Sequence, residues 1–189
     1  MAPRPRERIL AAATRLFSEE GIHATGVDRV ITEAGVAPMT VYRHFAGKDE
    51  LVTATLERWS EQWLGWLRSE ARGDDARARL EGLWDALEKW FADEGFHGSY
   101  VANVANELRA KPGHPAQATI AAHRAALREL LGELARAAGV PSPAEAAVAL
   151  HTLIDGATAV AVIDRQPGAA ASARAKAAAV LAEPALAGR

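Results

Sequence analysis

Cysteine is absent from the 189 residues of this chain. A disulfide framework and thiolate chemistry are therefore excluded, and the absence fits a reducing compartment. Membrane and export patterns are missing too. The sequence contains no uninterrupted run of about 18 apolar residues that could form a transmembrane helix. The opening MAPRPRERIL lacks the apolar stretch of a signal peptide. We therefore expect a cytoplasmic protein with no membrane contact.

Signatures of catalysis are equally scarce. No Gly-rich phosphate loop follows a strand, GxSxG and HExxH do not occur, and the six histidines are scattered. Glu107, His123 and His151 are conceivable metal ligands on facing helices, but no pair of them has a ligand spacing within one helix. We predict no enzyme activity, no cofactor and no metal. The alternative from another class is a ligand-binding or enzymatic all-α bundle.

The charge is low and unevenly placed. The formal net charge is −2, which argues against indiscriminate coating of nucleic acid. Residues 1–48 hold seven basic and five acidic side chains, whereas the remainder holds 15 basic and 19 acidic ones. This asymmetry is modest, and its direction fits an N-terminal part that contacts DNA.

The most informative stretch is 26–45, GVDRVITEAGVAPMTVYRHF, which predicts two short helices joined by a tight turn. Apolar residues at i, i+3, i+4 and i+7 make the stripe of the first helix: Val27, Val30, Ile31 and Ala34. Gly35 can end that helix in a left-handed conformation. Pro38 suits the first turn of the second helix, and Val41 and Phe45 would face the first. The pattern predicts a helix-turn-helix, whose second helix fits the major groove of DNA.

The outer face of the second helix strengthens this interpretation. A helical hairpin with Gly in its turn is common in all-α proteins, so periodicity alone is weak evidence. Donors of hydrogen bonds to phosphates or base edges cluster here, however. The residues left for the sides and the outer face are Met39, Thr40, Tyr42, Arg43 and His44, with Lys48 just beyond.

Residues 8–52 resemble the DNA-binding domain of the TetR family of bacterial transcriptional repressors. The matching pieces are RILAAATRLFSEEGIHAT, GVDRVITEAGV and TVYRHFAGKDELV. The resemblance implies that Thr40, Tyr42, His44 and Lys48 contact DNA, and that Thr25 begins the second helix and touches a phosphate. We take the DNA-binding set to be Thr25, Pro38, Met39, Thr40, Tyr42, Arg43, His44 and Lys48.

The chain departs from the family pattern at four positions. Many members carry a small polar cap and a Lys or Arg where this chain has Ala37, Pro38 and Met39. Ala37 is a poor N-cap, and Met39 offers a base only apolar contact, such as with a thymine methyl. Asp28 would repel phosphate where several members are basic or polar. The domain assignment stands, but an operator sequence does not carry over from relatives.

The rest of the chain predicts an all-α protein. Helices are expected at about 6–20, 48–72, 75–94, 99–109, 116–138, 143–164 and 170–183 besides the two of the hairpin, and the tail from Pro184 is expected to be disordered. We assign an N-terminal three-helix helix-turn-helix domain to residues 1–47. A helical-bundle domain for ligand binding and dimerisation takes residues 48–189.

The second domain has an aromatic-rich interior with polar residues on otherwise apolar faces. Apolar walls with a few polar anchors suit a small-molecule site, although each residue alone could equally be core. The candidate ligand residues are Trp63, Trp66, Trp84, Tyr100, Asn103, Glu107, His123, His151 and Asp155. The family resemblance implies an effector, which would be largely apolar or aromatic.

The last two expected helices are rich in alanine. Gly156, Ala157 and Ala159 allow another helix to approach closely, and so much apolar surface suits burial between subunits. The alternative is that these helices pack only on their own subunit. The resemblance implies a homodimer joined through these two helices. We therefore expect a dimeric repressor that binds a palindromic operator and is released by a ligand.

Overall fold

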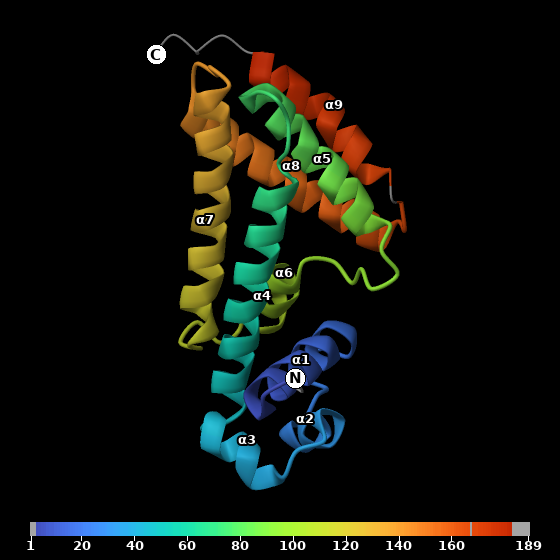
Figure 1. Ribbon diagram of the computed structural model, residues 1–189, viewed down its shortest axis with the longest axis vertical. Helices are drawn as coiled ribbons and strands as arrows, with labels where there is room; N and C mark the ends of the chain where they lie inside the picture. The colour runs from blue at the N-terminus through green and yellow to red at the C-terminus, as the bar shows by residue number, and fades with distance from the viewer. Residues whose placement is uncertain (1–2, 167, 183–189) are drawn as a thin grey trace. The chain divides into compact units, whose positions relative to one another are not determined.

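The computed structural model describes residues 3–166 and 168–182, and over these ranges the chain forms nine α-helices and no strand (Figure 1). The bounds are α1 Pro5–Glu19, α2 Val27–Ala34, α3 Pro38–His44, α4 Lys48–Glu70, α5 Ala76–Phe91, α6 Tyr100–Glu107, α7 Ala116–Ala137, α8 Pro143–Ile163 and α9 Ala169–Ala182. The all-α prediction is confirmed, and each predicted helix end lies within about one turn of the observed one. The predicted disorder from Pro184 falls outside the described residues.

The helices belong to two compact units, which we call the head and the body. The head comprises the chain through Gln62 together with 99–123, and the body comprises 63–98 together with the chain from Arg124. Both α4 and α7 begin in the head and continue into the body. The head thus contains α6 as well as α1–α3.

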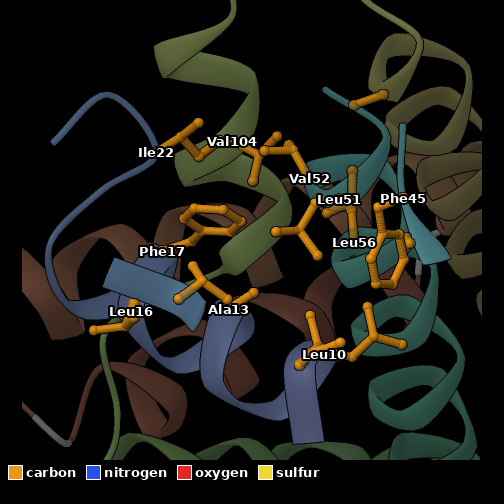
Figure 2. Packing of buried hydrophobic residues seen from close by; sticks show 14 of the residues in the cluster. Leu10, Ala13, Leu16, Phe17, Ile22, Phe45, Leu51, Val52, Leu56 and Val104 are labelled. Carbon is orange, nitrogen blue, oxygen red and sulfur yellow. The ribbon is translucent and has the colours of Figure 1, made fainter. Parts of the chain in front are cut away.

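One continuous apolar cluster forms the core of the head (Figure 2). The stripe of α1 buries Leu16 and Phe17, and the first turns of α4 contribute Leu51 and Val52. Each of these side chains contributes roughly 1.5–3 kcal/mol when it leaves water. The same cluster includes Val104 of α6, so residues far apart in the sequence share one core.

In the body, α9 packs against α8 and α5. The guanidinium of Arg174 on α9 binds two carboxylates of α5, with Nε 2.6 Å from Glu81 and Nη1 2.7 Å from Asp85. Among the described residues, α8 is long and apolar enough by length and composition to cross a membrane. It nevertheless carries His151 and Asp155 and packs on α9 as a core helix does, so we assign no membrane span.

Candidate DNA-binding surface and effector residues

The helix-turn-helix bends at Gly35, directly after α2. Its φ of 59° lies in the left-handed region, and its N–H donates to the carbonyl of Ile31. From α1, the Arg8 guanidinium donates to the carbonyls of Ala34 at 2.6 Å and Gly35 at 2.7 Å. These carbonyls lack partners within α2, and a cation is favourable at this end of a helix. Arg8 therefore fastens the turn, a role that the sequence pattern did not reveal.

Helix α3 separates an inner from an outer face. Pro38 is its first residue, and Ala37 caps it without a side-chain hydrogen bond, as its residue type predicts. Val41 is 1% exposed and Phe45, which follows α3, is 2% exposed, so both join the head core. Met39 is 75% exposed and Tyr42 52%.

The remaining predicted contacts of α3 lie beside these two. Pro38 and Arg43 are exposed, and Thr40 and His44 are half-buried. The Arg6 guanidinium of α1 lies over the Phe45 ring, 5.5 Å from its centroid, which places another cation at the end of α3. The helix therefore offers solvent a face of thioether, phenol, hydroxyl, imidazole and guanidinium groups.

Lys48 is the first residue of α4 and is half-buried. Burial lowers the pKa of its ammonium, and the nearby charge of Lys111 lowers it further, whereas Glu107 and Asp49 act in the opposite direction. The loop that carries Lys111 is held against α4, because Nε2 of His114 lies 3.3 Å from an Asp49 carboxylate oxygen. The charge of Lys111 therefore acts on Lys48 at the start of α4.

Thr25 differs from the other predicted DNA contacts, because it is completely buried. Its hydroxyl donates to the carbonyl of Gly21 at 2.8 Å. A side-chain contact between Thr25 and a phosphate would require this bond to open. In the described conformation, Thr25 stabilises the connection between α1 and α2.

Four predicted effector residues lie in the head. The hydroxyl of Tyr100 is 2.9 Å from that of Thr55, and burial raises the pKa of Tyr100. Nδ1 of His123 lies 2.8 Å from the Ser60 hydroxyl, and Asn103 is half-buried. The fourth, Glu107, accepts hydrogen bonds from the connection between α1 and α2.

The other five predicted effector residues lie in the body. The rings of Trp63 and Trp66 pack with that of Trp90 at centroid distances of 5.5 to 6.4 Å. Phe96 packs edge-on against Trp90 at 5.0 Å. We call the rings of Trp63, Trp66, Trp90, Phe91 and Phe96 the aromatic cluster. Trp84, the remaining tryptophan of the body, is buried in α5.

A small polar network accompanies α8. Asp155 lies 3.6 Å from Nε2 of the buried His151, one turn away, and 3.0 Å from the Arg124 guanidinium of α7. Burial lowers the pKa of His151, the carboxylate of Asp155 opposes this shift, and the charges of Arg124 and Arg128 add to it.

Four of the predicted effector residues thus belong to the head and five to the body. Within the described ranges, a hollow of about 410 Å³ lies between α7 and α8 of the body, and none of the predicted residues lines it. Its lining is Arg128, Glu129, Gly132, Glu133, Arg136, Ala144, Ala147 and Val148. In the part of the chain that the structure describes, no three His, Asp or Glu side chains are grouped to hold a metal ion.

Comparison with known proteins agrees with the helix-turn-helix described above. Residues 9–55 match the family described as bacterial regulatory proteins, tetR family. The transcriptional activator FasR of Mycolicibacterium smegmatis is 33% identical over 88 residues, which are 44% of this chain and 40% of FasR. The transcriptional repressor KstR2 of Rhodococcus jostii is 35% identical over 79 residues, 41% of this chain and 39% of KstR2. The matches therefore span about two fifths of these curated relatives.

A solved structure extends the similarity over almost the whole chain. SCO4454, a TetR-family transcriptional regulator from Streptomyces coelicolor, superposes with a TM-score of 0.82 and 31% identity. The match covers 94% of this chain and 88% of SCO4454. Regulators of this kind are not enzymes, which removes the enzymatic alternative. A shared helix-turn-helix, a shared body and this level of identity show that the chain belongs to the TetR family of bacterial transcriptional regulators.

Proposed function

We propose that the chain is a homodimeric repressor that binds a palindromic operator and leaves it when a small-molecule effector binds. The observation that carries the DNA-binding part is the outer face of α3. Met39 and Tyr42 are exposed although neighbouring apolar residues are buried, and a short helix with such a face fits a major groove. Lys48 and Arg43 would hold phosphates and so fix the register.

A dimer is supported by the outer surface of α8. Val148, Val160, Val162 and Ile163 are large apolar residues that stay exposed in the single chain. A second copy would cover this surface, with α9 beside it. Two heads would then read half-sites spaced one helical turn or a multiple apart, about 34–36 Å per turn.

Effector release is supported by the aromatic cluster and by the course of α4. Trp66 and Trp90 are half-buried, which makes part of the cluster accessible to an apolar or aromatic ligand. Because α4 runs from the head into the body, we propose that a ligand tilts it and changes the spacing of the two heads. The ligand must prefer the state that is off DNA, since equal affinity for both states shifts nothing.

Repression is the finer part of this proposal. FasR is named an activator and KstR2 a repressor, so relatives act in both directions. A reporter driven by a promoter that overlaps the operator tests the sign, because a repressor lowers expression and an activator raises it. We propose residues 1–47 for DNA binding and 48–189 for effector binding and dimerisation, in a cytoplasmic protein.

Selection of bound duplexes from a random DNA pool, at two salt concentrations, tests the function. Enrichment of a palindrome, with affinity that falls steeply with salt, is the expected result. A folded, dimeric and ligand-free protein that enriches no sequence would refute operator binding. The wild-type affinity for the enriched duplex then serves as the reference for every variant below.

A further inference from the structure

Helix α6 contributes to the core that holds the helix-turn-helix. Val104 is completely buried in the same cluster as Phe17 of α1 and Val52 of α4, and Ile22 lies beside it (Figure 2). Val101 of the preceding turn is buried there as well. A displacement of α6 must therefore disturb the packing of the head itself.

At the end of α6, the Glu107 carboxylate binds the backbone of the connection between α1 and α2. Oε1 accepts the N–H of Ile22 at 2.8 Å, and Oε2 accepts the N–H of His23 at 2.8 Å. Nδ1 of His23 lies 2.9 Å from Oε2. Each amide is bound to a different oxygen, and a glutamine in the same orientation would turn a donor group toward one of the two amides.

The position of Glu107 is unfavourable for its own helix. An anion at the C-terminal end of a helix opposes the helix dipole, so Glu107 contributes nothing to α6 through this effect. Gly21 leaves room for the carboxylate, since a Cβ there would lie 3.3 Å from Oε1. Burial raises the pKa of Glu107, but the bonds from Ile22 and His23 outweigh burial and the pKa is lowered overall.

We propose that Glu107 is a positioning residue for DNA recognition: through its carboxylate, α6 sets the entry of α2 and hence the placement of α3. This inference rests on the proposed DNA-binding function and gives Glu107 a different role from the predicted effector contact. It adds a contact within the head that does not use α4.

Three substitutions separate positioning from charge. Glu107→Gln removes the charge and one acceptor, whereas Glu107→Asp keeps the charge but is one methylene too short to reach both amides. Asp28→Asn is the matched control, because Asp28 is an exposed anion in the first turn of α2 outside this contact. Affinity for the selected operator is measured by fluorescence anisotropy at one salt concentration.

Positioning predicts that both Glu107 variants bind the operator about tenfold more weakly, while Asp28→Asn binds as well as wild type or better. A role through charge alone predicts the opposite order. Glu107→Gln and Asp28→Asn would both bind more tightly, since each removes an anion near the phosphates, and Glu107→Asp would resemble wild type. That second pattern would overturn the proposal.

Amide hydrogen exchange provides a readout that does not depend on DNA. At least one of the Ile22 and His23 amides should exchange at least about tenfold faster in each Glu107 variant, while amides of buried α1 residues stay protected and show that the head is folded. Unchanged exchange at Ile22 and His23 would overturn the contact. Faster exchange with unchanged operator affinity would overturn positioning. If wild type enriches no duplex, the proposed function fails by itself, and exchange still decides whether Glu107 holds the connection.

Discussion

Replacement of Gly35 by alanine tests how the helix-turn-helix is held. At a φ of 59°, an L-residue strains the folded state by about 1–2 kcal/mol. Alanine also lowers the conformational entropy of the unfolded chain, which offsets about 0.4–1 kcal/mol of that strain. The new Cβ would lie 2.8 Å from Nη2 of Arg8. Because that atom ends a flexible side chain, Arg8 would move away and lose its bonds to the carbonyls of Ala34 and Gly35.

The expected loss has two parts of similar size. Strain leaves a net cost of about 1 kcal/mol. Two hydrogen bonds from a cation at an exposed site contribute about 1 kcal/mol together after solvent screening. We expect Gly35→Ala to destabilise the head by about 2 kcal/mol, and to cost only about 1 kcal/mol in a chain that already carries Arg8→Ala.

Urea unfolding of the four chains of this double-mutant cycle gives the coupling directly. Gly65→Ala is the control, because Gly65 is an exposed position within α4 where an added Cβ would meet no neighbouring group, and alanine there should stabilise the helix by about 0.5–1 kcal/mol. Strictly additive effects of Gly35→Ala and Arg8→Ala would refute the reasoning, since they would mean that Arg8 does not hold the turn.

Further expectations concern DNA contacts, a buried hydroxyl and acid stability. Tyr42→Phe and Lys48→Ala should weaken binding to all duplexes alike, whereas Thr40→Ala should change base preference; a selection at fixed salt that shows neither effect would contradict the docking of α3. Tyr100→Phe should lower the free energy of unfolding by about 1 kcal/mol, because its hydroxyl bond is buried; unfolding at the wild-type urea midpoint would contradict this. Because the pKa of Glu107 is lowered in the folded state, its ionised carboxylate adds stability that is complete above about pH 4.3 and is lost as the pH falls through the folded-state pKa. The difference in unfolding free energy between wild type and Glu107→Gln should therefore shrink in acid. A difference that is independent of pH from about 3 to 7 would disprove this expectation.

Local chemistry explains why the helix-turn-helix could be predicted from the sequence. Gly35 ends α2 because a left-handed residue is needed there, and Pro38 begins α3 because its missing N–H has no partner in a first turn. Val41 and Phe45 follow from helical spacing. Each of these assignments depends on neighbours within a few positions, which a single sequence displays directly.

The partners of distant side chains could not be predicted in the same way. Glu107 binds amides 84 and 85 positions away, and Arg8 binds the carbonyl of Ala34 26 positions away. Helical periodicity identifies the buried face of α6, but it does not state which helix that face meets. Consequently the inclusion of α6 in the head, rather than only in a later domain, emerged from the packing around Val104.

A polar residue on an apolar helix face can serve a ligand or bond to another part of the chain, and the hydrogen bonds of the head distinguish the two cases. A buried polar group needs a hydrogen-bond partner, which can be a ligand or another part of the chain. Tyr100 pairs with Thr55, and Nδ1 of His123 pairs with Ser60. An effector that used these groups would have to replace internal hydrogen bonds worth about 1 kcal/mol each.

The aromatic carbons of the half-buried Trp66 and Trp90 need no hydrogen-bond partner. An apolar effector therefore meets the smaller barrier at the aromatic cluster, and Trp66→Ala should weaken the effector response more than operator affinity. Equal losses in both measurements would mean that the cluster supports the fold of the body rather than the ligand.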